Sequence, residues 1–152
     1  MQLNPNLAKV QSDLGTLLLR KGRGDEAVAH YQAAIAIQPA NAFFLNNLAW
    51  VLATCPNPQV RNGARAVELA QQAERFGGAG NPAILGTLAA AYTEAGRFPD
   101  ALRTAQHALE LATAQTNFAQ VDILKANIVL YQAGSPFHDT SRTNAAPEPN
   151  RP

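Results

Sequence analysis

Two aromatic rings and two amides lie within eight residues of one another in the first third of the chain. Phe43, Asn46, Asn47 and Trp50 are spaced i, i+3, i+4 and i+7, which places them on one face of a helix. Rings supply contact area, and asparagine amides both donate and accept hydrogen bonds, so this cluster is suited to holding a peptide. Two other interpretations stay open: Trp50 packs into the core beneath residues 55–63, and the asparagines are solvated surface residues.

The remaining reactive side chains do not form a catalytic or metal-binding set. His30, His107 and His138 are spread over two helical segments and the tail, and Cys55 has no histidine close to it in sequence. Aspartate and glutamate occur singly at the starts of predicted helices, where the helix dipole favours them, rather than as an acid and base pair. We therefore expect no catalytic residue, no metal site and no cofactor.

The composition is that of a globular chain with little charge. Apolar residues make up 47% of the 152 residues, charged residues make up 15%, and the net charge is +1. So small a charge gives no field for attracting nucleic acid or an acidic membrane. No apolar run approaches the roughly 18 residues of a membrane-spanning helix. We expect a soluble protein, cytoplasmic by default, with neither a nucleic-acid nor a membrane partner.

A segment with a regular helical pattern precedes the aromatic and amide cluster. In residues 8–41, apolar residues recur with the period of a helix, stop at Gly22 and Gly24, and resume until the residue before Pro39. This pattern predicts two helices joined by a short turn, the first over about residues 6–21. Small residues stand where these helices would cross, among them Gly15 and Ala27.

The landmarks of this segment resemble the tetratricopeptide repeat, a helix–turn–helix unit of 34 residues. The matching residues are Leu14, Gly15, Leu18, Gly22, Ala27, Tyr31, Ala34 and Pro39. Gln11 stands where the family has an aromatic residue. The resemblance implies an all-α fold, namely a right-handed α-solenoid of three such repeats followed by a C-terminal capping helix.

The landmarks recur at Leu48-Ala49 and at Leu88-Ala89, which divides the chain into segments. About five residues are inserted between the two helices of the second repeat. We expect a remnant of a preceding repeat at residues 1–7, repeat 1 at 8–41, repeat 2 with its turn insertion at 42–81, and repeat 3 at 82–115. A capping helix at 116–134 and a disordered tail at 135–152 complete the expected order.

In this family the first helices of the repeats line a concave groove, and the resemblance carries that role to one face of the predicted helices. The implied peptide-binding residues are Lys9, Thr16, Arg20, Phe43, Asn46, Asn47, Trp50, Thr87, Ala90 and Glu94. The family's clamp for chaperone tails needs lysine and asparagine in the first repeat, asparagine in the second, and lysine and arginine in the third, and only Asn47 matches it. Without those cations a terminal carboxylate loses its charge-assisted hydrogen bonds, so we do not expect that clamp.

We expect a non-catalytic protein–protein interaction scaffold that binds a protein or peptide partner in the concave groove. The alternative is a structural end segment of a longer repeat array, which associates with itself or is appended to a larger enzyme. If residues 1–7 are a remnant, one apolar stripe of the first helix lacks its partner: Leu7, Val10, Leu14 and Leu17. Exposed apolar area favours self-association, which predicts a homodimer through the end helices.

Overall fold

A computed structural model describes residues 4–77 and 79–142, and within these residues the chain forms helices and connecting loops but no strand. The α-helices are α1 (Pro5–Arg20), α2 (Gly24–Ile37), α3 (Ala42–Thr54), α4 (Gly63–Gly77), α5 (Pro82–Glu94), α6 (Phe98–Ala114) and α7 (Phe118–Gln132). A short 3-10 helix, η1 (Thr140–Arg142), ends the described part of the chain. The all-α fold expected from the sequence is confirmed.

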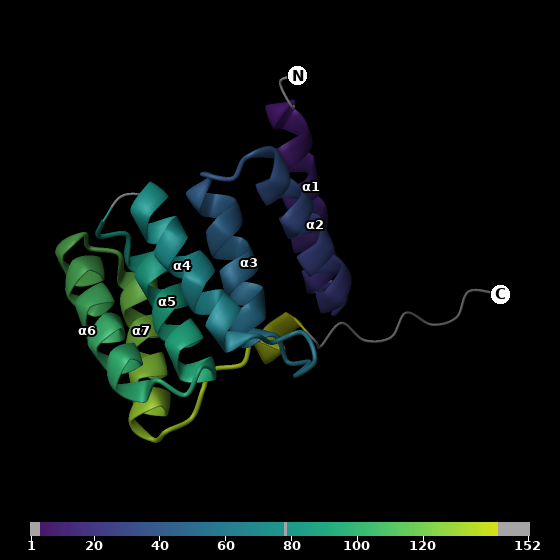
Figure 1. Ribbon diagram of the computed structural model, residues 1–152. Helices are drawn as coiled ribbons and strands as arrows, with labels where there is room; N and C mark the ends of the chain where they lie inside the picture. The colour runs from purple at the N-terminus through teal and green to yellow at the C-terminus, as the bar shows by residue number, and fades with distance from the viewer. Residues whose placement is uncertain (1–3, 78, 143–152) are drawn as a thin grey trace.

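The helices stack side by side in chain order, from α1 and α2 at one end to α6 and α7 at the other (Figure 1). The pairs α1–α2, α3–α4 and α5–α6 pack together, and the second helix of each pair packs on the first helix of the next. In addition, α3 contacts α5 and α5 contacts α7, so these first helices form a layer of their own. In this helical repeat arrangement each unit covers the apolar face of its neighbour.

Similar glycine turns close α1, α5 and α7. Gly22, Gly96 and Gly134 have φ angles of 74°, 75° and 70°. In each turn the N–H group of the following residue donates a hydrogen bond to a carbonyl in the last turn of the helix. Because glycine takes this left-handed conformation without a steric penalty, these positions end the helix and reverse the chain.

The helices of each pair cross at residues with little or no side chain. In the second helices, alanines seven residues apart have no exposed surface: Ala27 and Ala34 in α2, Ala66 and Ala73 in α4, and Ala101 and Ala108 in α6. Between these alanines stands Tyr31 in α2, whereas α4 and α6 have Ala70 and Ala105. The three crossings therefore share the buried alanines. They differ at the position between these alanines, where the first pair has a tyrosine ring and the other two have alanine.

The ring of Tyr31 explains the glycine opposite it. A Cβ atom on Gly15 would lie 3.0–3.1 Å from three atoms of the Tyr31 ring. The ring is buried, and its hydroxyl shares a hydrogen bond of 2.9 Å with the Oγ1 atom of Thr16, so it has little freedom to move aside. The later pairs, with alanine in place of the tyrosine, have Ala49 and Ala89 in place of Gly15.

The connection between α3 and α4 is longer than the turn between α1 and α2, and it is tied to the end of α5. The N–H group of Asn62 donates to the carbonyl of Leu52 over 2.8 Å. A Cβ atom on Gly63 would lie 2.5 Å from the backbone nitrogen of Ala95, so a side chain at this position would collide with the backbone of α5's end. The close approach brings Arg61 beside Glu94, the last residue of α5.

Replacing Gly15 tests the crossing of α1 and α2. Gly15→Ala is expected to lower the free energy of unfolding by about 1 to 3 kcal/mol, because the new methyl group overpacks the Tyr31 ring. In a Tyr31→Ala background the same change is expected to raise it by up to about 1 kcal/mol, because alanine has the higher helix propensity. Urea unfolding followed by circular dichroism measures both values. A loss of stability in both backgrounds would show that the ring is not the obstacle.

Candidate functional site

A pocket of about 450 Å³ opens on the layer formed by α3, α5 and α7. Its lining consists of residues from these three helices and from the segment after α7: Asn46, Asn47, Trp50, Ala83, Gly86, Thr87, Gln120, Ile123, Leu124, Ala126, Asn127, Phe137 and Asp139. Its volume falls in the range of typical ligand pockets. The residues recur at helical spacing, so each helix presents one face to the same hollow.

Gly86 leaves the middle of this pocket open. It lies in α5 between the faces of α3 and α7, and a Cβ atom there would lie 3.2 Å from the Nε2 atom of Gln120. The added Cβ atom would also lie 3.5 Å from the Cδ2 atom of Leu124. The absence of a side chain at Gly86 therefore keeps space between α5 and α7 at the cost of helix propensity.

The pocket is lined by neutral polar groups and apolar surface. Four of its side chains are amides: Asn46, Asn47, Gln120 and Asn127. Among the described residues that line it, Asp139 is the single charged side chain, and there is no lysine or arginine. Thr87 turns its hydroxyl to its own helix, donating to the carbonyl of Ala83 over 3.2 Å. The amides are therefore the groups best placed to meet a polar ligand.

Asn46 has an unused acceptor. Within the described part of the chain, its Oδ1 atom is buried and accepts no hydrogen bond. A buried polar atom without a partner usually costs about 1 to 3 kcal/mol, so such atoms are uncommon in folded proteins. Asn127 is also buried, with 5% of its surface exposed, although it lines the same hollow.

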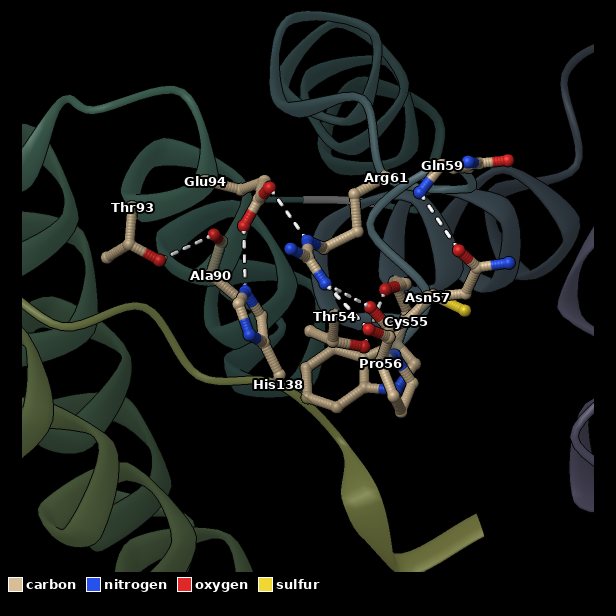
Figure 2. A network of polar contacts seen from close by, with 11 residues as sticks. Thr54, Cys55, Pro56, Asn57, Gln59, Arg61, Ala90, Thr93, Glu94 and His138 are labelled. Carbon is tan, nitrogen blue, oxygen red and sulfur yellow. Dashed lines mark hydrogen bonds and ion pairs between the residues drawn. The ribbon is translucent and has the colours of Figure 1, made fainter. Parts of the chain in front are cut away.

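A polar network stands at one end of the pocket (Figure 2). Arg61 donates from Nε to the Oε1 atom of Glu94 over 2.9 Å, and from Nη1 to the carbonyls of Cys55 and Pro56 over 2.8 and 3.1 Å. The other carboxylate oxygen of Glu94 lies 3.0 Å from the Nε2 atom of His138. Glu94 thus links the connection between α3 and α4 to the segment that follows α7.

That segment runs back from α7 toward α3 (Figure 1, yellow). The ring of Phe137 lies against the indole of Trp50, with centroids 5.8 Å apart and an interplanar angle of 37°. The N–H group of Asp139 donates to the carbonyl of Thr54, the last residue of α3, over 2.8 Å. Residues 135–142 were expected to belong to a disordered tail; instead these contacts hold them against α3 and α5. Residues 143–152 lie outside the described part.

Comparisons with known proteins agree with this architecture. A model of the tetratricopeptide repeat matches residues 7–38. The solved first TPR (tetratricopeptide-repeat) domain of Spaghetti (RPAP3), bound to HSP90 peptide SRMEEVD, is similar with a TM-score of 0.68 at 20% identity, covering 88% of this chain and 98% of that one. Residues 7–38 thus match the tetratricopeptide repeat, and the fold of the chain is that of solved TPR domains.

Two further TPR domains, both of human RPAP3, have the same fold. The first gives a TM-score of 0.68 at 20% identity over 94% of this chain and 100% of its own. The second, in complex with HSP70 peptide SGPTIEEVD, gives 0.62 at 18% identity over 80% and 98%. A comparison with curated proteins finds no match.

Neither a membrane-spanning helix nor a metal-binding cluster is found within the described residues. No helix there is both long and apolar enough to cross a membrane. No three histidine, cysteine, aspartate or glutamate side chains in that part gather into a group that could hold a metal ion.

Four of the residues assigned to the groove from the TPR resemblance meet in the pocket: Asn46, Asn47, Trp50 and Thr87. Ala90 does not, because it is 1% exposed and belongs to the core. Glu94 stands beside the pocket, but its two carboxylate oxygens are used by Arg61 and His138. Phe43 is 62% exposed, lies edge-on to Phe44 and is outside the pocket lining.

The three residues expected on α1 also lie outside the pocket lining. Lys9 forms an exposed ion pair of 2.7 Å with Asp13 on the same helix. Thr16 bonds to the hydroxyl of Tyr31 between α1 and α2, and Arg20 is exposed in the last turn of α1. The pocket therefore involves the second and third helix pairs and α7, while α1 contributes only through Ser12, to which the amide of Asn47 donates over 3.5 Å.

The ten groove residues implied by the resemblance include none from α7 or from the segment after it. The role of Asn127 could have been predicted from the sequence, because this polar residue interrupts the buried apolar face of α7 that includes Val121, Leu124 and Tyr131. Burial raises the pKa of the Tyr131 hydroxyl well above its usual value. Phe137 had no such signal, since it lies in an aperiodic stretch after Gly134.

The unused acceptor of Asn46 gives a stability test. Asn46→Leu is expected to raise the free energy of unfolding by about 1 kcal/mol, because it replaces a buried unpartnered atom with an apolar group of similar volume. Asn47→Leu is the matched control on the neighbouring residue and should give no gain, because it removes the hydrogen bond to Ser12. Urea titration measures both variants. Destabilisation by Asn46→Leu would mean that the amide is satisfied and that stability gives no reason to assign it a ligand.

Proposed function

We propose that this chain is a non-catalytic protein–protein interaction module that holds an extended peptide segment in the pocket between α3, α5 and α7. The observation that supports this most directly is the array of amides around an open hollow, with the Oδ1 atom of Asn46 buried and unpartnered. An amide there costs stability, so its presence in the pocket lining calls for a reason other than folding.

The chemistry of the lining suits a peptide backbone. Each amide side chain offers both a donor and an acceptor, which matches the alternating C=O and N–H groups of an extended chain. Apolar surface from Trp50, Ile123 and Leu124 lies beside the amides and can take up ligand side chains. Aromatic and aliphatic surface supplies affinity, while the amides fix orientation.

The charges of the pocket lining indicate which side chains the bound peptide segment lacks. The peptides in the two solved neighbours, SRMEEVD and SGPTIEEVD, both end in acidic residues and a terminal carboxylate. Among the described lining residues of this pocket there is no cation, and Asp139 contributes a carboxylate. An acidic peptide would meet repulsion instead of charge-assisted hydrogen bonds. We infer that this chain prefers an internal peptide segment without carboxylates near the pocket.

A displayed library of random peptides, selected on the full chain, tests the proposal. Selected peptides should be poor in aspartate and glutamate and should lose about tenfold or more in affinity for Ala126→Phe, whose ring would fill the pocket. Ala119→Phe is the matched control, because Ala119 is an exposed alanine of α7 outside the pocket lining. Equal binding to both variants, or selection of acidic peptides, would overturn the proposed site.

The exposed apolar face of α1 favours a second candidate, association between copies of the chain. Leu7, Val10, Leu14 and Leu17 are all exposed on α1, and Phe118 and Val129 are exposed on α7 at the other end of the stack. Uncovered apolar faces at the ends of a helical repeat are disposed to pair. Such a chain would act as a structural, self-associating segment, with or without a peptide in the pocket.

Multi-angle light scattering tests this second candidate. The wild-type chain is expected to show a mass above that of the monomer at high protein concentration, and Leu17→Lys should return it to the monomer by charging the exposed face of α1. Lys21→Leu is the matched control at an exposed position of the turn after α1 and should not reduce the mass. A monomeric wild-type chain at every concentration would exclude association through the ends.

A further inference from the structure

Residues 137–139 are attached to the end of the pocket by three contacts of different chemical kinds. Phe137 supplies an aromatic ring to Trp50, His138 a ring nitrogen to Glu94, and Asp139 a backbone N–H to the carbonyl of Thr54. The three receiving groups belong to α3 and α5, whereas the segment belongs to the chain beyond α7. A short stretch held by side-chain contacts together with a backbone hydrogen bond is how a bound peptide is held.

We propose that Trp50, Thr54 and Glu94 form a binding site for an aromatic residue followed by a basic, hydrogen-bond-donating residue. Residues 137–139 occupy this site as an internal ligand, and a partner segment with the same pattern displaces them. The proposal rests on the proposed function and deepens it, because it states which residues the partner presents next to the amide-lined pocket.

The aromatic requirement comes from Trp50. Its indole is half-buried, packs against the core on one side, and lines both the main pocket and a smaller hollow of about 60 Å³ beside Thr54 and Cys55. The ring of Phe137 covers part of its remaining surface in a tilted arrangement. Tryptophan offers a large and rigid surface, so an aromatic ring of the partner is a good replacement for Phe137.

The basic requirement comes from Glu94. Its side chain is 17% exposed, and the neighbouring Arg61 uses only the Oε1 atom. The Oε2 atom faces His138 and loses this donor once the segment leaves, so another donor can take its place. A lysine, arginine or histidine of a partner meets that need, whereas an acidic residue would face the carboxylate directly.

The third contact fixes the backbone of the ligand. Thr54 is the last residue of α3, so its carbonyl has no acceptor role within that helix and takes the N–H of Asp139. The residue in this place of a partner must therefore have an N–H group, which excludes proline. The resulting pattern is aromatic, basic, then any residue except proline.

The site continues directly into the amide-lined pocket. Trp50, Phe137 and Asp139 line that pocket as well, so the internal segment forms one of its walls. A partner long enough to use both the amides and Trp50 must take the place of residues 137–139. Because the internal segment is tethered, it competes at an effective concentration in the millimolar range for a short flexible linker. Short partner peptides will therefore bind weakly unless the internal contacts are weakened.

The test uses a fluorescently labelled peptide of residues 135–142, Ser-Pro-Phe-His-Asp-Thr-Ser-Arg, titrated into the full-length chain. The double variant Phe137→Ala/His138→Ala weakens the internal ligand and should bind the peptide about tenfold or more tightly than the wild type does, because the tethered competitor is lost. Fluorescence anisotropy measures the affinity. The control variant Phe118→Ala/His107→Ala removes an exposed phenylalanine and an exposed histidine elsewhere and should bind as weakly as the wild type.

The peptide itself supplies two further controls. A peptide with Phe137→Ala should lose binding to the double variant, whereas one with His138→Lys should keep it, because lysine still donates to Glu94. Equal affinity of the double variant and the wild type for the original peptide, or no binding to either, would overturn the proposal. Tight binding of a peptide with His138→Glu would overturn the basic requirement.

Trp50 provides a second measurement that also checks folding. It is the only tryptophan, so acrylamide quenching of the emission reports on this site alone. Quenching should increase in the double variant with unchanged circular dichroism, and the added peptide should reverse the increase. Unchanged quenching in a folded double variant would show that Phe137 does not cover Trp50.

The outcome can be separated from that of the proposed function. Glu94 holds His138 but is not part of the pocket lining, so adding Glu94→Gln to the double variant should weaken binding of the 135–142 peptide, whereas Ala126→Phe changes the pocket lining itself. If library peptides bind independently of Ala126→Phe while the 135–142 peptide binds as expected, the amide pocket fails and the Trp50 site stands. The reverse pattern would support the amide-lined pocket and overturn the Trp50 site.

Discussion

The close crossing of paired helices is the constraint on which the rest of this structure depends. At each crossing the second helix presents alanines with no exposed surface, so the space left for the first helix is set by a single intervening residue. Where that residue is Tyr31, the first helix has glycine; where it is alanine, the first helix has alanine. The large residue on the second helix is thus matched by the smallest residue on the first. Helices held this closely leave the faces of α3, α5 and α7 in fixed positions, and a pocket between them follows from their spacing.

The helices of the regular part of the chain shape the pocket. The polar residues that line this pocket lower the free energy of unfolding. Gly86 lowers helix propensity but leaves space between α5 and α7. Asn46 has a buried acceptor without a partner in the described residues, and Asn127 interrupts an otherwise apolar face. These features all converge on one hollow. Apolar or larger residues in this hollow would make a more stable helical stack, which is the physical basis of the proposed peptide site.

The sequence allowed prediction of the fold because the small residues at the crossings are also the landmarks of the repeat. It allowed prediction of Asn46, Asn47, Trp50 and Thr87 in the pocket because helical spacing fixes which residues share a face. The same reasoning failed for Ala90. α5 lies between α4, α6 and the neighbouring first helices, so almost all of its faces are buried and only a narrow strip near its start is open. Gln120 and Phe137 were missed because their roles depend on how α7 and the following loop pack on α3 and α5, which has no periodic signal in the sequence.

The two irregular segments of the chain meet at one carboxylate, and this gives the end of the pocket its chemistry. The long connection after α3 places Arg61 on one oxygen of Glu94, and the segment after α7 places His138 on the other. An isolated carboxylate with so little exposure would be costly, and Arg61 alone leaves one oxygen without a donor. The longer connection therefore does more than lengthen a turn. By anchoring Glu94 it creates a site that favours a donor over an acceptor, next to a pocket that lacks cations. A repeat unit with the ordinary short turn would have neither Arg61 nor a reason to hold Glu94 there, and its groove would not distinguish basic from acidic segments at this end.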